Sequence, residues 1–454
     1  MNYISTRGSI EPIEVAYAAA DIYAEDGGLY VPEVMPRVFD DHDMLCLAWL
    51  SHRRRFAFIA GKFMKEIYIG IPALFGDSAF AAEDFNGEVP FVVEQEGTYF
   101  AEMRHGPSGS AFDLILRPLP MVFEYFITAT GKGKPYIYGY DVEPNGERAP
   151  LIIVPSAGDE ALALINAVKT LTKGKIAVFY PARETNFLYP RMMEDKQDDD
   201  VIVLGVDAGI NEISHFITKF IKCRESAEIA ENHGLYLMRG DSQSWFGVVS
   251  HVTYLFSVYC HMLIKEQIKL GDWINLAIPY DDTLEMAALA LYAKQMGLKA
   301  DKIISFAPRG SILYNIIVRG QLVSSCLGDN TFVPVALERL LHCASGMDAN
   351  FINNVIKGLN DNETYDLPKE IVKKLQDAFY LYCPADDETG TAEAALERYK
   401  TESGDEKKSL VIISGSRNKQ NEVNSSSICT ESKVIGLEDI AFEITKFAKT
   451  GGRL

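Results

Sequence analysis

The chain has 454 residues, of which 48% are hydrophobic, so it is long enough for two or three domains with full cores. Its 44 basic and 63 acidic side chains give a net charge of −19, which disfavours nucleic acids and anionic membranes as partners. Its seven cysteines form no Cys-x-x-Cys pair, which is typical of a reduced, cytoplasmic protein rather than of a disulfide framework or a zinc site.

The first 90 residues are predicted to form a mostly helical segment. Apolar residues recur at helical spacing around residues 14–24 and 44–67. No basic stretch followed by an apolar leader opens the sequence, so a signal peptide is not expected. We also find no uninterrupted run of about 18 apolar residues, so we expect no membrane span.

From about residue 90 onward, short apolar runs alternate with helical stretches. The runs at 90–93 and 151–154 end at turn residues, as buried parallel strands do. Further strands are expected at 175–180, 201–206, 274–278, 302–306 and 410–414, and helices at 159–171, 210–222, 245–267 and 285–296. This alternation predicts doubly wound sheets with helices on both faces. The polar stretches 384–409 and 415–430 are interpreted as solvated loops.

Four short motifs occur in a recognisable order. Residues 3–8 read Tyr-Ile-Ser-Thr-Arg-Gly, and residues 26–33 read Asp-Gly-Gly-Leu-Tyr-Val-Pro-Glu. Residues 105–113 read His-Gly-Pro-Ser-Gly-Ser-Ala-Phe-Asp, and residues 156–159 read Ser-Ala-Gly-Asp. On these motifs the chain resembles the threonine synthase family, whose members use pyridoxal phosphate (PLP). The first two motifs carry most of the resemblance.

The resemblance implies a fold and a domain division. Members of the family have the fold-type-II architecture of PLP enzymes, which is tryptophan synthase beta-like, with two doubly wound α/β subdomains flanking a cleft. We therefore expect a threonine synthase N-terminal-like segment over residues 1–90. The two α/β subdomains are expected to follow over residues 91–454.

The family motif matched by residues 105–113 carries the lysine that forms an imine with PLP, the electron sink of the reaction. Laid on without a gap, the motif retains His105 and Asp113 and places Phe112 at the lysine. Phenylalanine has no amine and forms no imine. Lys132 and Lys134 follow in sequence and are interpreted as residues of an exposed turn. His105 is either a general base, since its ordinary pKa lies near neutrality, or a packing residue inherited from the family.

The phosphate-binding turn of the family is also altered. There, glycines let backbone N–H groups at a helix start surround the cofactor's phosphate. Here the corresponding residues are Asp281, Asp282, Thr283, Leu284 and Glu285. Carboxylates repel a phosphate, by at least about 1 kcal/mol each. An alternative interpretation is that Asp281 and Asp282 simply cap the following helix.

The substrate loop of the family has likewise gained negative charge. It corresponds to Ser156, Gly158, Asp159 and Glu160, in which Glu160 replaces a threonine. Together with Asp113 and the residues of the phosphate turn, these carboxylates are expected near the ancestral cleft. Carboxylates at strand ends are able to bind a hard cation such as Mg²⁺ or Ca²⁺. The alternative is a set of separate, solvated helix caps.

Three functions from different classes follow from these observations. The first is a threonine synthase homologue that no longer binds PLP and instead binds a small molecule or a protein partner, whose identity the sequence does not give. The second is an active threonine synthase that converts O-phosphohomoserine to threonine and phosphate with a substitute lysine. The third is a PLP-independent enzyme that uses a metal in the acidic cleft. We favour the first, because loss of the lysine, of the phosphate glycines and of the substrate loop all agree.

Overall fold

The computed structural model describes most of the chain. The residues described are 2–20, 22–36, 40–64, 76–77, 79–81, 84–85, 89–128, 136–137, 140–141, 149–156, 158–171, 173–183, 188–384, 390–415 and 433–450. The predicted turn with Lys132 and Lys134 lies outside these residues, as does nearly all of the predicted loop 415–430.

The N-terminal segment combines a small sheet with three helices. Its antiparallel sheet has the order β2-β1-β3, with β1 Asn2–Ser5, β2 Ile13–Glu14 and β3 Tyr30–Pro32. The helices are α1 Val15–Ala20, α2 Asp41–Ala48 and α3 His52–Phe63. The sheet was not predicted, and the helix expected over 44–67 is two helices. Ser51 adopts extended backbone (φ −67°, ψ 162°), which separates α2 from α3.

Five parallel strands form the first large sheet, in the order β11-β8-β9-β10-β20. Their bounds are Leu235–Arg239, Ala149–Pro155, Lys175–Pro181, Val201–Val206 and Val434–Ile435. One face packs on α6 (Pro118–Thr128) and α7 (Asp159–Val168), and the other on α9 (Ile210–Lys222). Side chains along each strand point alternately to the two faces of the sheet. Ile152 and Val178 belong to the hydrophobic core on one face, and Ile153 and Phe179 to the core on the other. The predicted helices on both faces are thus confirmed here.

Six strands form the second large sheet, in the order β18-β13-β12-β19-β5-β4. Their bounds are Phe379–Tyr382, Ala300–Phe306, Ile274–Ile278, Ser409–Ile413, Thr98–Glu102 and Phe91–Gln95. All neighbours are parallel except β4 and β5, which are antiparallel. The run at 90–93 was expected to be a buried parallel strand, and this is wrong. As an edge strand, β4 has one strand neighbour, and Phe91 is 37% exposed.

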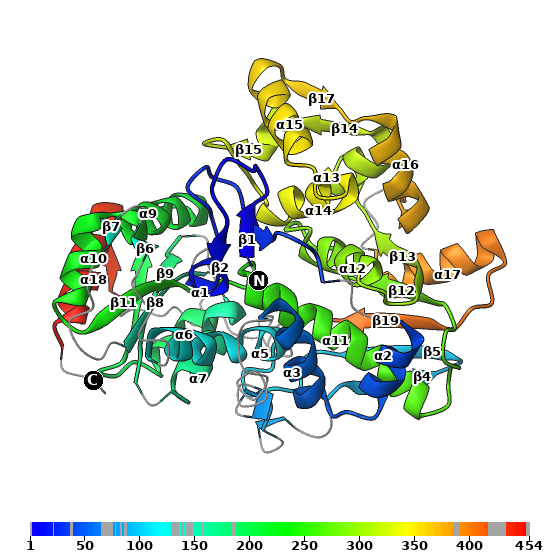
Figure 1. Cartoon of the computed structure of the whole chain (residues 1–454), viewed down its shortest axis with the longest axis horizontal. Coiled ribbons are helices and arrows are strands. Elements are labelled where there is room, and N and C mark those ends of the chain that lie inside the picture. Colours follow the sequence, from blue (N-terminus) through cyan, green and yellow to red (C-terminus); the bar gives the residue numbers. More distant parts are fainter. Residues whose placement is uncertain are drawn as a thin grey trace.

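The other elements pack around these two sheets (Figure 1). The remaining helices are α5 Phe112–Leu116, α8 Leu188–Glu194, α10 Arg224–Glu231, α11 Trp245–Ile264, α12 Glu285–Gln295, α13 Ile312–Tyr314, α14 Val335–Ser345, α15 Ala349–Asp361, α16 Lys369–Ala378, α17 Ala392–Ser403 and α18 Ile440–Ala448. Short helical turns are η2 Asn315–Arg319, η3 Ser324–Cys326 and η6 Leu437–Asp439. Small strands are β6 Tyr136–Ile137, β7 Tyr140–Asp141, β14 Gln321–Val323, β15 Leu327–Gly328, β16 Thr331–Phe332 and β17 Thr364–Asp366.

Helix α17 corrects the prediction of a solvated loop over 384–409. The Thr391 hydroxyl accepts a hydrogen bond from the Ala394 N–H and so caps the helix start. Ala395 and Leu396 then pack against the second sheet, which makes the helix part of a core rather than a loop. The Asp, Glu and Thr of this stretch masked its apolar face in the sequence.

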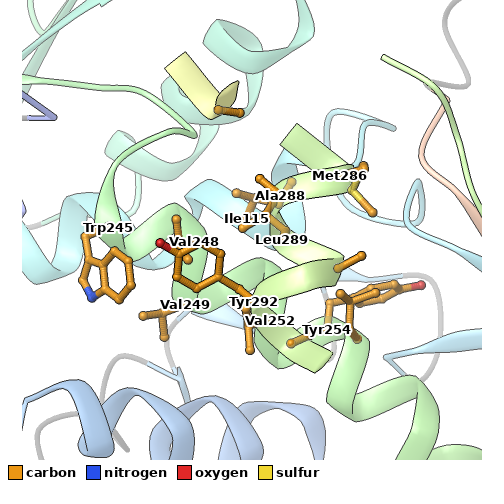
Figure 2. Close-up of a cluster of buried hydrophobic side chains, with 14 of the residues drawn as sticks. Ile115, Trp245, Val248, Val249, Val252, Tyr254, Met286, Ala288, Leu289 and Tyr292 are labelled. Carbon is orange, nitrogen blue, oxygen red and sulfur yellow. The ribbon is translucent and has the colours of Figure 1, made fainter. Parts of the chain in front are cut away.

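Helix α11 is the central core helix, and it packs against α2, α3, α5 and α12 (Figure 1). Figure 2 shows Trp245, Val248, Val252 and Tyr254 of this helix among side chains of α5 and α12. The aromatic and Met residues of this helix are buried: Trp245, Phe246, Tyr254, Phe256, Tyr259 and Met262. By length and composition alone α11 would also qualify as a membrane span, which the sequence analysis did not expect. However, 83% of its apolar window is buried inside the protein.

Candidate functional site

The loop 105–110 is held against the start of α5 by the carboxylate of Asp113. Asp113 Oδ2 accepts hydrogen bonds of 2.7 Å from both the backbone N–H and the hydroxyl of Ser108. The side chain is fully buried, and burial raises the pKa of Asp113 to about 6, although the Ser108 bonds and the Arg117 charge oppose this. A side chain on Gly106 would collide with Asp113, since a Cβ there would lie 2.4 Å from the Asp113 Cβ. Asp113 therefore shapes the loop.

His105 lies on the outer side of the same loop. Its ring stacks on Phe91 with centroids 4.1 Å apart, and its Nε2 lies 3.0 Å from Glu102 Oε2. Burial would raise the pKa of Glu102, but hydrogen bonds from Arg104 and His105 outweigh this and leave it lowered. These contacts fit the packing interpretation of His105 better than the general-base one, which stays untested.

Phe112 is the first residue of α5 and is partly buried against the main core. Its N–H donates to the hydroxyl of Ser110 at 3.2 Å. The same hydroxyl donates to Asp159 Oδ2 at 2.7 Å, which joins the start of α5 to the start of α7. The structure thus brings the predicted lysine position and the predicted substrate loop together, through Ser110, which the sequence analysis did not single out.

Hydrogen bonds through Ser242 connect the start of α7 to the starts of α11 and α12. Gly158 precedes the helix, and its N–H lies 3.3 Å from the Ser156 hydroxyl. Glu160, in the first turn, accepts a 2.7 Å hydrogen bond from the backbone N–H of Ser242. Ser242 lies 3.4 Å from Glu285 through its own hydroxyl. Glu160 is therefore no separate solvated cap, which corrects that alternative for this residue.

We name Asp159, Glu160, Asp241 and Glu285 the acidic cluster. Burial raises the pKa of Glu160 to about 8, and the charges of Asp241 and Asp159 add to this. Burial also raises the pKa of Glu285 well above its ordinary value, and the charges of Asp281, Glu160 and Asp241 add to this. Both shifts favour the protonated carboxyl, because the two side chains are desolvated and close to like charges.

Asp281 occupies the start of helix α12. Its Oδ1 accepts the N–H of Glu285 at 3.0 Å and the Thr283 hydroxyl, and its Oδ2 accepts the N–H of Met286 at 3.3 Å. Leu284, just before the helix, has the left-handed conformation at φ 59°. The capping interpretation of Asp281 is confirmed. Asp282 instead accepts from the Tyr280 hydroxyl at 2.7 Å and faces no other predicted site residue in the contacts described.

Asp241, a member of the acidic cluster, and two residues beside the cluster, Arg339 and His251, were not predicted from sequence. Asp241 follows β11 and pairs with Arg239 at 3.1 Å. Arg339 of α14 is buried and donates to the Gln243 carbonyl at 2.9 Å; burial lowers its pKa, which the charges of Glu285 and Asp241 oppose. His251 of α11 lies 3.6 Å from Glu285, and burial lowers the pKa of His251 to about 3, so its ring is neutral. For Arg339 and His251, the available sign in the sequence was a charged or polar residue within a predominantly apolar helix.

The residues present do not fit PLP. Phe112 offers no amine, and no lysine is among the described residues that hydrogen-bond to Ser110, Asp159, Glu160, Ser242 or Glu285. The N–H groups of Glu285 and Met286, which begin α12, are already bonded to a carboxylate of the chain itself. A phosphate at this helix start would meet Asp281 in place of free N–H groups.

Comparisons with known proteins agree with the resemblance predicted from the motifs. Residues 2–69 match the family model described as the threonine synthase N terminus. The chain is 24% identical to threonine synthase-like 2 of Rattus norvegicus over 387 residues, which cover 83% of this chain and 75% of the relative. It is 25% identical to threonine synthase-like 1 of Homo sapiens over 296 residues, covering 62% of this chain but only 37% of the relative.

Solved structures show the fold. A PLP-bound threonine synthase from Brucella melitensis matches with a TM-score of 0.77 and 17% identity, covering 99% of this chain and 100% of the other. A threonine synthase from yeast matches with a TM-score of 0.77 and 18% identity, covering 98% of each chain. The predicted fold class, a fold-type-II PLP-enzyme-like α/β architecture, is confirmed by these matches. The predicted domain boundary at residue 90 stays a prediction.

Proposed function

We propose that this chain, which has the fold of threonine synthases and matches their N terminus over residues 2–69, has lost PLP binding and catalysis. In this proposal it acts as a pseudoenzyme that binds a small molecule or a protein partner. The occupied start of α12 carries the proposal. Asp281 holds the two N–H groups that a phosphate would need, so binding PLP there requires the chain to release its own cap.

Two further observations support the proposal independently. Phe112 replaces the imine-forming amine with a ring that is partly buried against the main core. The acidic cluster places carboxyl groups beside Ser110 and Ser242, and those of them that are ionised would repel a dianionic substrate phosphate. Loss of the lysine alone would prevent only imine formation. Together with the Asp281 cap and the acidic cluster, it would weaken binding of both the cofactor and the substrate.

A PLP titration of the full chain tests the proposal. Visible absorbance is recorded as PLP is added, and the sample is then reduced with borohydride, digested and mapped by mass spectrometry. An active threonine synthase, such as the yeast enzyme, serves as the positive control. We expect neither an imine absorbance band nor a pyridoxyl-lysine peptide. A band with a modified lysine would contradict the proposal and favour an active threonine synthase, converting O-phosphohomoserine to threonine and phosphate with a substitute lysine.

The acidic cluster favours a second candidate, a PLP-independent enzyme that uses a metal. Glu160, Asp241 and Glu285 act on one another electrostatically, and a divalent cation would relieve that repulsion. Mg²⁺ or Ca²⁺ bound by the native state would raise the midpoint of urea unfolding with cation concentration. A Glu160→Gln variant is the matched control, since it keeps the acceptor for Ser242. A midpoint that responds equally in both proteins places the cation elsewhere and rejects this candidate.

A cytoplasmic location is part of the proposal. In the described part of the chain all six cysteines are free thiols: Cys46, Cys223, Cys260, Cys326, Cys343 and Cys383. With a net charge of −19, neither a nucleic acid nor a membrane is proposed as a partner. Cell fractionation tests the location, and recovery in a secreted fraction would reject it.

A further inference from the structure

A pocket of about 700 Å³ lies at the other end of α11 from the acidic cluster. Ser242 precedes the first residue of α11, and the pocket is lined by residues of its last turn. The 20 residues of this helix span about 30 Å. The lining residues are Ala48, Trp49, Leu50, Ser51, His52, Arg53, Arg55, Phe80, Phe85, Val89, Pro90, His261, Ile264 and Lys265. The pocket is therefore a separate site, which the proposed function leaves unused.

Aromatic and aliphatic side chains form most of the pocket wall. Among the lining residues, Phe80 and Phe85 are buried, whereas Trp49 is 77% exposed and Ile264 is 40% exposed. An indole left in water beside a pocket is unfavourable unless something covers it. The wall thus suits the flat apolar body of a small molecule.

The polar groups of the wall are basic. Arg53, Arg55 and Lys265 line the pocket, and its lining among the described residues includes neither Asp nor Glu, in a protein with a net charge of −19. Arg53 is paired with Asp77 at 3.4 Å. Lys265 has no ion pair among the described residues. The described lining therefore offers basic side chains to a ligand, and basic groups attract an anion.

Arg55 is a buried cation without a carboxylate partner. It is 5% exposed, and it donates to the carbonyls of Leu47 and Ala48 at 2.9 Å each, which satisfies the end of α2. No carboxylate of the described residues lies within ion-pair distance of its guanidinium. Burying a charge without a counter-ion is costly, so an anion in the pocket would stabilise this arrangement.

The start of α3 supplies further donors. Ser51 precedes the helix, and its side chain makes no capping hydrogen bond. The N–H groups of Arg54 and Arg55 donate to the Ser51 carbonyl, whereas His52 and Arg53, the first two residues of the 12-residue helix, line the pocket. His52 is 4% exposed; its Nδ1 lies 2.9 Å from the Ser257 hydroxyl, and its Nε2 is buried with no partner. When Ser257 donates to Nδ1, Nε2 carries the hydrogen and is a free donor. Burial lowers the pKa of His52 to about 3, so the ring is neutral.

We propose that this pocket binds a small aromatic carboxylate. Its carboxylate would lie at the start of α3 beside His52 and Arg55, and its ring against Trp49, Phe80 and Phe85. One buried cation and one helix start match the single charge of a carboxylate. A bare inorganic anion would leave the apolar wall uncovered. The inference does not depend on whether PLP is bound.

Isothermal titration of the full chain with 2-naphthoate tests this proposal, with the neutral 2-naphthamide and inorganic phosphate as matched probes. We expect saturable binding of one naphthoate, at least 10-fold weaker binding of the amide, and no binding of phosphate. Equal affinity for naphthoate and naphthamide would overturn the proposal, because the basic groups would then contribute nothing. Absence of saturable naphthoate binding would overturn it as well.

Two surface variants separate this site from general charge effects. Lys265→Glu reverses a charge at the pocket, whereas Lys269→Glu makes the same change at an exposed residue outside the lining. Both are exposed positions, so both proteins should fold. We expect naphthoate affinity to fall about 10-fold in the first and to stay within about two-fold in the second. Equal losses in both variants would reject the pocket as the binding site.

Discussion

The backbone of Gly106 passes so close to Asp113 that a Cβ on Gly106 would lie 2.4 Å from the Asp113 Cβ and 2.6 Å from its Oδ2. The same carboxylate accepts two hydrogen bonds from Ser108. Gly106 and Asp113 both match the threonine synthase motif, and in this chain both serve the shape of the loop that leads to Phe112. In this chain, these two motif residues determine the shape of the loop through packing and hydrogen bonding.

Replacing Gly106 with alanine should destabilise the protein by about 2 kcal/mol, because the methyl group must displace Asp113 from a packed site. The midpoint of urea unfolding measures the effect. Gly61→Ala is the matched control, since a Cβ at this position in α3 meets nothing within 4 Å. The control should stabilise the helix by about 0.5–1 kcal/mol. A Gly106→Ala protein as stable as the parent would show that the loop moves freely.

Replacing Asp281 with alanine should lower stability by about 1 kcal/mol, because the N–H groups of Glu285 and Met286 lose their acceptor. Asp282→Ala removes the same charge one residue later, where the carboxylate bonds only to the Tyr280 hydroxyl. Urea unfolding of both variants should therefore show a clear loss for the first and less than about 0.5 kcal/mol for the second. Equal losses would mean that charge, and not capping, sets the effect.

Restoring the lysine should not restore the cofactor. Phe112→Lys supplies an amine, but the start of α12 is still capped by Asp281. We therefore expect no stable imine band when PLP is added to Phe112→Lys. The double variant Phe112→Lys, Asp281→Gly should bind PLP more tightly than the single one, by at least about 10-fold, because it frees the helix start. Tight PLP binding by Phe112→Lys alone would show that the residue at position 112 is enough to prevent PLP binding and that the Asp281 cap is not.

The raised pKa of Glu160 predicts a stability difference that depends on pH. The carboxyl titrates near 4.5 in the unfolded chain and at about 8 in the folded one, so the folded state binds more protons between these values. Stability from this group is then present below pH 4.5 and is lost as the pH rises to about 8. Glu160→Gln cannot ionise and keeps the bond from Ser242, so it should be more stable than the parent at pH 8, by on the order of 2 kcal/mol.

Urea unfolding at pH 5 and pH 8 measures this difference. The gap between Glu160→Gln and the parent should widen from pH 5 to pH 8. A gap that stays constant, or narrows, would mean that Glu160 keeps its charge in the folded protein. In that case a cation or the Arg339 guanidinium neutralises the acidic cluster.

The strongly periodic elements could be predicted from sequence. The helix expected over 210–222 has those bounds in the structure, and the strand expected over 274–278 likewise. Their apolar patterns are long and bounded by turn residues, so local physics determines them. The small strands of the N-terminal segment have two to four residues and are stabilised by pairing between distant segments, which leaves no local pattern.

The candidate site was predicted in part. Identity of residues at Phe112, Asp281 and Glu160 followed from the family motifs. Their more distant partners did not: Ser110 meets Asp159, and Ser242 and Asp241 meet Glu160, only through the tertiary fold. Glu160 and Ser242, for example, are 82 residues apart in sequence, and only the folded chain brings them together. Sequence reasoning therefore found the altered positions and missed the contacts that replace the lost ones.

The position of β5 between β4 and β19 in the second sheet has a consequence for synthesis. Residues 98–102 pair with residues 409–413, so β5 leaves the ribosome long before its inner neighbour exists. The first sheet similarly receives its last strand, β20, after the whole second sheet has been translated. Until then β5 has an open edge on a nascent chain, where unintended strand pairing begins. The second sheet is thus completed only after residues 409–413 have been synthesised.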